Sequence, residues 1–228
     1  MKIIVTGSSG FIGFHVSKKL LGSGNKVHGI DSMNNYYDVN LKKARLAILK
    51  KYKNFSFSKA KIENSKDLGK AFKKFKPTVV IHLAAQAGVR YSIEKPRVYL
   101  DSNITGTYNI IEIAKRLNVK HLIMASSSSV YGANKKIPFK EVDKTETQMS
   151  IYAATKKSNE SMAHAYSNIW KIPITMVRFF TVYGPWGRPD MALFKFTKGI
   201  LNNKKIDIYN NGKMYRDFTY IDDIVNGI

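Results

Sequence analysis

Residues 1–31 read MKIIVTGSSGFIGFHVSKKLLGSGNKVHGID, and this stretch decides the fold. A short apolar run, 2–6, leads into a loop with three spaced glycines, and a helical pattern over 11–21 follows. A second apolar run, 26–30, ends at Asp31. Strand, glycine-rich turn, helix and strand in this order predict a βαβ unit whose helix N-terminus can hold a pyrophosphate.

The same alternation of apolar runs and helical patterns continues along the chain. We expect further strands at 55–59, 78–83, 120–126 and 174–178, and helices at 41–49, 65–75, 98–117, 150–170 and 221–228. This order predicts an α/β fold with a doubly wound parallel (Rossmann) sheet. The alternation weakens after residue 178, so we expect a dinucleotide-binding domain over 1–178. Residues 179–228 would then begin a smaller, truncated substrate-binding domain.

Composition excludes several classes of protein. The chain has 228 residues and no cysteine, so disulfides and thiolate ligands are excluded and we expect no metal site. It has no signal-peptide pattern and no apolar run long enough to span a bilayer, so we expect a soluble cytoplasmic protein with no membrane partner. The net charge of +22 is spread as separate lysine pairs beside helical apolar positions. Such spacing indicates solvated helix faces, and we expect no specific nucleic-acid partner.

Asp31 indicates which dinucleotide the loop would bind. It ends the second strand, where a carboxylate can accept hydrogen bonds from the ribose hydroxyls of an adenosine. The same charge repels the 2′-phosphate of NADP, and the neighbouring Ser32 supplies no compensating cation. The sequence therefore favours NAD.

Tyr152 and Lys156 form the candidate catalytic pair. They are four residues apart in the predicted helix 150–170, so they share one face with Cβ atoms about 5–6 Å apart. A phenol is a poor base at neutral pH because its ordinary pKa is about 10. An ammonium about 4 Å away is worth roughly 4 kcal/mol at an effective dielectric constant of about 20. We therefore expect Lys156 to lower the pKa of Tyr152 and make the phenol a general base.

A run of four serines, 126–129, ends the strand that precedes this helix. Their hydroxyls would reach the same edge of the sheet as the tyrosine and could hold the oxygen of a reacting alcohol. Structural alternatives stay open for both motifs. Tyr-x-x-x-Lys is also an ordinary helix-surface pair, and at least one of the serines would serve only as a polar turn.

The glycine spacing, the HLAAQ stretch at 82–86, the serine run and the Tyr-x-x-x-Lys pair together resemble the extended short-chain dehydrogenase/reductase family of NAD-dependent epimerases and dehydratases. The resemblance implies a bound NAD and a catalytic triad of Ser127, Tyr152 and Lys156. It also implies cofactor contacts from the glycine loop, the strand ends and two helices: Gly7, Gly10, Phe11, Ile12, Gly13, Asp31, Ile62, Leu83, Ala84, Ala85, Gln86, Asn103, Tyr152 and Lys156.

The chain departs from the pattern of this family at two informative positions. Lys61 stands before Ile62 where relatives carry an acidic residue, so we expect a weakened contact with the adenine. Ser129 stands just before a Val-Tyr-Gly sequence, where the dehydratases and the decarboxylases that make UDP-xylose carry an acid. Because elimination of water needs that acid and epimerisation needs only hydride removal and return, we expect an epimerase.

Residues 178–192, RFFTVYGPWGRPDMA, and 215–223, YRDFTYIDD, resemble the UDP-glucuronate 4-epimerases within this family. The resemblance implies that Thr181 meets the hexuronate carboxylate, and that Arg216 grips the UDP diphosphate, a task that suits a planar guanidinium. A local ion pair between Arg216 and Asp217 stays open as the structural alternative. The implied substrate-binding set is Ser128, Ser129, Thr181, Arg188, Tyr209 and Arg216. Arg188 would meet the nucleotide and Tyr209 would pack on the uracil.

These features together predict NAD-dependent epimerisation at C4 of a UDP-hexuronate, from UDP-glucuronate to UDP-galacturonate, through a 4-keto intermediate. Another UDP-sugar 4-epimerase and a catalytically silent NAD-binding fragment stay open as alternatives. The resemblance also implies that the chain is incomplete after Ile228, since relatives continue beyond it. It further implies a homodimer that pairs through the helices at 98–117 and 150–170.

Overall fold

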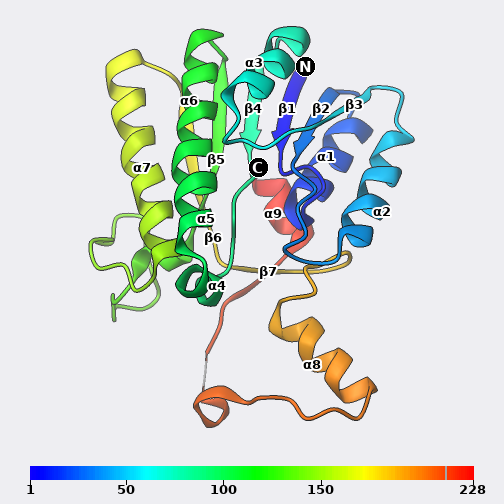
Figure 1. Ribbon diagram of the computed structural model, residues 1–228. Coiled ribbons are helices and arrows are strands. Elements are labelled where there is room, and N and C mark those ends of the chain that lie inside the picture. The colour runs from blue at the N-terminus through cyan, green and yellow to red at the C-terminus, as the bar shows by residue number, and fades with distance from the viewer. Residues whose placement is uncertain (214) are drawn as a thin grey trace.

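The computed structural model describes residues 1–213 and 215–228, apart from the side chain of Tyr209. Its centre is a six-stranded parallel sheet with the order β3-β2-β1-β4-β5-β6 (Figure 1). The strands are β1 (Lys2–Thr6), β2 (Lys26–Asp31), β3 (Phe55–Lys59), β4 (Val79–His82), β5 (His121–Ser127) and β6 (Ile174–Phe179). The predicted doubly wound sheet is confirmed. Strand order reverses between β1 and β4, so the carboxyl ends of these strands border the crevice where open α/β sheets bind ligands.

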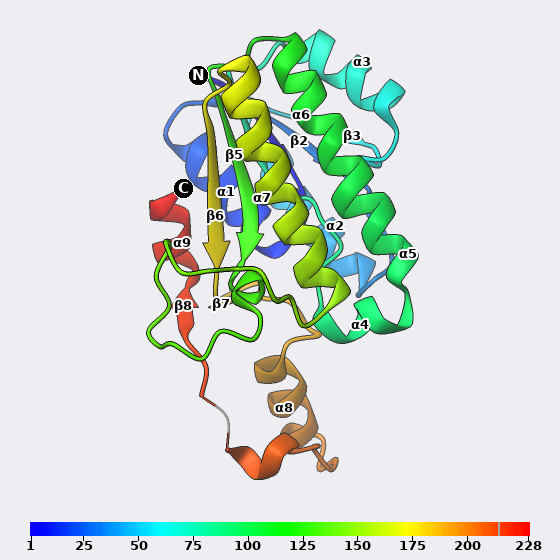
Figure 2. The ribbon, with the colours of Figure 1, turned by 90° about the vertical axis from the view of Figure 1, so that its left-hand side faces the viewer.

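Helices cover both faces of this sheet, as Figures 1 and 2 show. One face carries α1, α2 and α9, and the other carries α3, α6 and α7. The helices are α1 (Phe11–Gly22), α2 (Val39–Lys50), α3 (Ser65–Phe75), α4 (Val89–Glu94), α5 (Pro96–Tyr99), α6 (Thr107–Arg116), α7 (Ile151–Trp170), α8 (Ala192–Leu201) and α9 (Ile221–Gly227).

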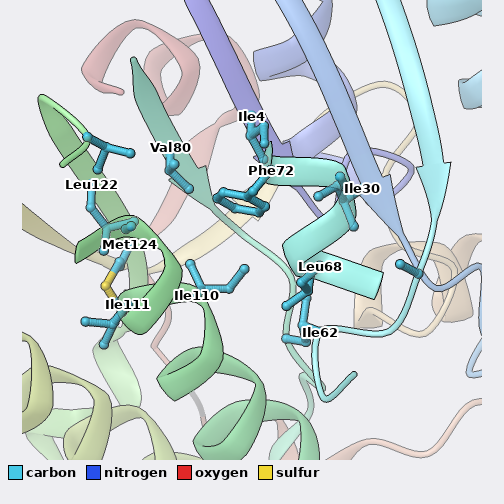
Figure 3. Close-up of a cluster of buried hydrophobic side chains, with 14 of the residues drawn as sticks. Ile4, Ile30, Ile62, Leu68, Phe72, Val80, Ile110, Ile111, Leu122 and Met124 are labelled. Carbon is cyan, nitrogen blue, oxygen red and sulfur yellow. The ribbon is translucent and has the colours of Figure 1, made fainter. Parts of the chain in front are cut away.

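Each face of the sheet has its own hydrophobic core. Figure 3 shows the first core, in which helix side chains such as Phe72 and Ile110 pack on Ile4 and Val80 of the sheet. The second core joins α1, α2 and α9 to the opposite face of the same strands. Strands buried on both faces have nearly continuous apolar sequences, and this is why the short runs at 2–6 and 78–83 were recognisable.

The chain leaves the sheet after β6 and returns to it. Two short strands, β7 (Thr181–Tyr183) and β8 (Phe218–Tyr220), pair in parallel just below the main sheet. Between them the chain runs outward through α8, which has no buried residue. It then comes back as α9, whose Ile221 and Val225 are buried in the core against α1. The domain division expected at residue 178 stays a prediction.

The single helix expected over 98–117 is wrong in detail. The structure has α5, then a π-helical stretch (Leu100–Gly106), and then α6. The wider turn brings the buried side chain of Asn103 to the loop after β4, and Gly106 packs so closely on Ile62 that a Cβ would lie 2.5 Å from the Ile62 side chain. Periodicity does not distinguish such a stretch from an α-helix, and π-helical turns occur often at functional sites.

Two general properties complete the architecture. In the part of the chain that the structure describes, no helix has both the length and the apolar character needed to cross a membrane. Within the same residues, no group of three or more His, Asp or Glu side chains is arranged to hold a metal ion.

Candidate functional site

The glycine loop is as tight as its sequence suggests. Gly7 has φ +72°, in the region that L side chains rarely adopt, and a Cβ there would lie 2.9 Å from the backbone nitrogen of Ala84. A Cβ on Gly13 would lie 2.1 Å from the carbonyl oxygen of Gly7. These glycines therefore let the start of α1 lie directly against the ends of β1 and β4.

The first turn of α1 is free to bind an anion. Its N-cap is Gly10, which offers no side-chain hydrogen bond, and the first turn contains no acidic residue. The first N–H groups of a helix have no acceptor within the helix, and they carry a partial positive charge. The N–H groups of Phe11, Ile12 and Gly13 thus lie beside the loop and suit a pyrophosphate.

Asp31 ends β2 at the same edge of the sheet. One carboxylate oxygen accepts a hydrogen bond from the Ser9 amide at 3.0 Å, and the other accepts one from the Met33 amide at 2.8 Å. Each oxygen retains a further lone pair for a ribose hydroxyl. The loop and the carboxylate are thus fixed to each other, and together they fit the pyrophosphate and the adenosine ribose of a dinucleotide.

Two buried cations from α2 join this region, and sequence reasoning missed both. The ammonium of Lys42 donates to the backbone oxygen of Asn34 at 2.8 Å and to its side-chain oxygen at 2.6 Å. It also lies close enough to Asp31 for the carboxylate to act on its pKa, which burial lowers overall. The neighbouring Ser32 supplies no cation, but the fold brings the Lys42 ammonium to Asp31 from α2. Arg45, the second cation, is fully buried.

The loop after β4 forms the opposite wall. The buried amide of Asn103 accepts from the Gln86 backbone N–H at 2.8 Å and donates to the Gln86 carbonyl at 3.0 Å. The structure thus places Asn103 behind Gln86, where it fixes the loop, while Leu83, Ala84 and Ala85 are partly exposed. His82 is bonded through its two ring nitrogens to threonine hydroxyls, and burial lowers its pKa to about 3, so it has a structural role.

The serine run divides into structural and site-facing members. The Ser126 hydroxyl donates to Glu160 at 2.6 Å, and this carboxylate is also held by Arg178, so Ser126 belongs to the structure of the strand end. Ser127 caps a short 3₁₀ turn by accepting from the Ser129 amide at 3.2 Å. Ser128 and Ser129 are partly exposed in that turn. Ser126 therefore has a structural role at the end of β5 and does not belong to the turn.

Tyr152 and Ser127 are brought together by the pairing of α7 with the end of β5. Burial raises the pKa of Tyr152, while a hydrogen bond with Ser127 and the charge of Arg188 act against this rise. Tyr152 also packs edge-on against Tyr99, with ring centroids 6.1 Å apart. Tyr99 was another residue that the sequence did not single out, and its hydroxyl is bonded to the carbonyls of Ala87 and Gly88.

Lys156 lies on the same helix but bonds elsewhere. Its ammonium donates to the carbonyl of Ala125 at 2.7 Å, and burial lowers its pKa to about 8. The expectation that Lys156 lowers the pKa of Tyr152 is therefore not met by the protein groups alone. Burial of the phenol raises its pKa, and Ser127 and Arg188, rather than Lys156, act against this rise.

The segment after β6 brings another cation to the phenol. Arg188 is paired through two nitrogens with Asp190, at 3.0 and 2.5 Å, and Asp190 also accepts from the Tyr36 hydroxyl at 3.2 Å. The positive charge of Arg188 lowers the pKa of Tyr152. Arg188 therefore acts on the candidate catalytic tyrosine. Thr181 lies on β7, is partly buried, and its backbone N–H donates to the backbone carbonyl of Asp217.

Arg216 makes no contact with the residues described above. Arg216 is exposed, and its guanidinium makes a 3.4 Å hydrogen bond to the Tyr215 carbonyl. Within the described residues it forms no ion pair with Asp217, so that structural alternative is not supported. The side chain of Tyr209 lies outside the described part of the chain.

Comparisons with known proteins agree with this geometry. The model of the NAD dependent epimerase/dehydratase family matches residues 3–228. Protein CapI of Staphylococcus aureus is 60% identical over the whole chain, which covers 68% of that relative. A probable UDP-glucuronate 4-epimerase of Rhizobium meliloti (strain 1021) is 55% identical, again over the whole chain, which covers 67% of it.

Among solved structures, UDP-glucuronic acid 4-epimerase from Bacillus cereus, in complex with UDP-glucuronic acid and NAD, is similar with a TM-score of 0.93 and 39% identity. The match covers 100% of this chain and 71% of that one. The similarity therefore extends over the sheet, the catalytic helix and the segment that follows β6.

Proposed function

This chain belongs to the NAD dependent epimerase/dehydratase family, and from this membership we propose that it epimerises UDP-glucuronate to UDP-galacturonate at C4. The observation that carries the proposal is the meeting of Ser127, Tyr152 and Lys156 at the carboxyl end of β5, across the crevice from the glycine loop. The similarity to proteins named as UDP-glucuronate 4-epimerases supports the choice of substrate.

NAD would be held by elements that fit its parts. The first N–H groups of α1, at Phe11, Ile12 and Gly13, would bind the pyrophosphate. Asp31 would accept hydrogen bonds from the adenosine ribose, and Gln86, fixed by Asn103, would border the nicotinamide half. When bound, NAD would supply the acceptor and donor of the hydride for C4 of the sugar.

The residues of the chain perform the proton transfer. Tyr152 takes the proton of the sugar 4-hydroxyl as a general base and gives it back to the 4-keto oxygen as a general acid. Ser127 shares a hydrogen bond with the phenol and would hold the same sugar oxygen. Lys156, fixed on the Ala125 carbonyl, adds a positive charge that would favour the phenolate once the site is closed to water.

Arg188 would recognise the sugar end of the substrate. Sequence comparison had assigned it to the nucleotide, but its charge lies close enough to Tyr152 to act on the phenol. A cation at that place suits the carboxylate of a hexuronate, and Thr181 would donate a further hydrogen bond to it. Arg216 remains the proposed contact of the diphosphate, and Tyr209 that of the uracil.

Incubation of the chain with NAD and UDP-glucuronate, followed by chromatographic separation of the products, tests this function. We expect UDP-galacturonate without UDP-pentose and without net formation of NADH, because the hydride returns to the sugar. UDP-glucose and UDP-N-acetylglucosamine in parallel reactions distinguish a different UDP-sugar 4-epimerase. Retention of NAD without turnover of any UDP-sugar would contradict the proposal in favour of a silent NAD-binding protein.

We propose in addition that two copies pair through α5, α6 and α7. These helices expose large apolar side chains toward solvent, such as Val98, Tyr108 and Ile151, which are 39%, 46% and 41% exposed. Sedimentation should give a dimer, and Tyr108→Glu should give a monomer; a monomeric wild-type chain would contradict this pairing.

The cytoplasmic location stays a prediction, which fractionation of producing cells would test.

A further inference from the structure

Arg45 connects two parts of the site that are far apart in the sequence. From α2, its guanidinium donates to the carbonyl of Ser9 in the glycine loop at 3.1 Å and to the hydroxyl of Tyr37 at 2.8 Å. Its other terminal nitrogen donates to the carbonyls of Trp186 and Gly187, at 2.5 and 3.1 Å. One planar group therefore bridges the cofactor loop and the turn that follows β7.

The surroundings of this cation are unusual. Arg45 is completely buried, yet its four acceptors are three backbone carbonyls and a phenol, all of them neutral. Its Nε has no hydrogen-bond partner. A buried charge without a paired carboxylate is unfavourable for stability alone. The bonds that it makes to the loop and the turn are therefore better explained by the geometry that they fix.

The turn that Arg45 holds carries conformations that need support. Gly184 has φ +143° and Trp186 has φ +59°, the latter being uncommon for a bulky residue. Directly after the turn comes Arg188, whose charge acts on Tyr152. Backbone in sparsely populated conformations persists where the surrounding structure holds it, and here two of the four bonds of Arg45 do so.

We propose that Arg45 is a positioning residue that fixes the turn 184–187 to the glycine loop and thereby places Arg188 beside the catalytic tyrosine. This role rests on the proposed function, because Arg188 is there assigned to the sugar end of the substrate. Arg45 itself touches neither reacting group; it acts through the backbone that it holds.

Arg45→Met tests the proposal, because methionine keeps an apolar stem of similar length and removes the donors. We expect kcat/KM for UDP-glucuronate to fall by about 10²-fold, the loss typical of a group displaced by about 1 Å, while the NAD Kd changes much less. The rising limb of the kcat/KM profile should move to higher pH. The reason is that Arg188 lowers the pKa of Tyr152, so its displacement raises that pKa.

The pH readout is specific because the other groups that face Tyr152 would stay in place. They are Ser127 from the end of β5 and Tyr99 from α5, and Lys156 on the helix of Tyr152 stays bonded to the Ala125 carbonyl. Arg188→Ala should give the same upward movement, and combining it with Arg45→Met should add little. Arg45→Lys should recover part of the loss, because one ammonium can reach only some of the acceptors that the guanidinium spans.

Lys43→Met is the matched control. Lys43 lies on the same helix and is exposed, so its removal should change neither kcat/KM nor the pH profile. Unchanged kinetics in Arg45→Met would overturn the proposal. A loss of activity that is uniform across pH and matched by a lowered melting temperature would also overturn it, because that result indicates a merely structural role.

A second readout works without turnover, so failure of the proposed function can be told apart. In a Trp170→Phe background, Trp186 is the remaining tryptophan of the chain. In this background, acrylamide should quench the fluorescence of Trp186 more strongly in Arg45→Met than in Lys43→Met or in the protein that carries only Trp170→Phe, because the turn is released. Equal quenching in all three proteins contradicts the positioning role, whether or not the chain epimerises a UDP-sugar.

Discussion

The carboxyl edge of the main sheet and the excursion between β7 and β8, residues 184–217, differ in how firmly they hold their side chains. At the sheet edge, the proposed catalytic and cofactor-binding side chains are buried or half-buried and are held by hydrogen bonds to neighbouring elements, as Lys156 is by its bond to the Ala125 carbonyl. In the excursion, α8 buries no residue, and Tyr215 is 98% exposed. The fold thus fixes the proton-transfer chemistry firmly and leaves the proposed nucleotide contacts on a loosely packed segment.

The difference teaches where substitutions should act. At the sheet edge a single change removes a group from a fixed arrangement, so it should alter the chemistry or the stability strongly. In the excursion a change removes a group with few partners, so stability should hardly respond. The predictions below test the two halves of this comparison.

Tyr152→Phe should have the largest effect. The substitution keeps the ring that packs on Tyr99 and removes only the hydroxyl that would move the proton. We expect the turnover of UDP-glucuronate to fall by about 10³-fold, within the range of general acid–base catalysis, while NAD affinity is kept. Steady-state kinetics and NAD titration check this, with the exposed Tyr108→Phe as control. Near-normal turnover would remove Tyr152 from its proposed role.

Lys156→Met should have the next largest effect, on how the free energy of unfolding depends on pH, because it removes a buried ammonium. The unfolded lysine holds its proton up to about pH 10.5, and the folded one releases it at about 8. Between these values unfolding takes up a proton, so the stability of the wild type should rise with pH relative to the variant. At about 1.4 kcal/mol per pKa unit the full change is about 3 kcal/mol. Urea midpoints at several pH values measure it, and a constant difference would refute it.

Arg216→Ala should have the smallest effect on stability. The guanidinium is exposed and makes one long hydrogen bond to a neighbouring carbonyl, so we expect the free energy of unfolding to change by less than about 0.5 kcal/mol. Urea denaturation measures this, and UDP titration of the same variant should show weakened binding. A loss of stability above about 1 kcal/mol would mean that the excursion is packed more firmly than the comparison states.

The sequence was sufficient to predict the parallel sheet and the tight glycine loop. Gly7 and Gly13 occupy positions where backbone groups approach too closely for a Cβ. Glycine is the residue without a Cβ, so the sequence indicates this close approach directly. The central strands β1 and β4 were recognisable because both of their faces are buried. Asp31 was identifiable because its place at the end of β2 follows from the order of elements.

The sequence was insufficient where a residue type has two common explanations. Arg45 lies in the stretch LKKARL, where a basic residue ordinarily belongs to the solvated face of a helix, and only the fold shows that it is buried. Among the four serines, the partner of Ser126 is Glu160, 34 residues away, so spacing could not tell it from Ser127. The pKa of Tyr152 depended on burial, which no pair spacing reveals.

The pairing of β7 with β8 has a consequence for how substrate range can change. Because the two strands are parallel and each has only three residues, the chain between them leaves one end of this small ribbon and re-enters at the other end, a short distance away. The outer portion, 191–217, is thus an insert with fixed ends, beyond the turn that Arg45 holds. An insert of this kind can be exchanged for that of a relative while the sheet edge that carries the proposed proton-transfer residues keeps its shape, so recognition of the nucleotide can change without a change in the reaction itself.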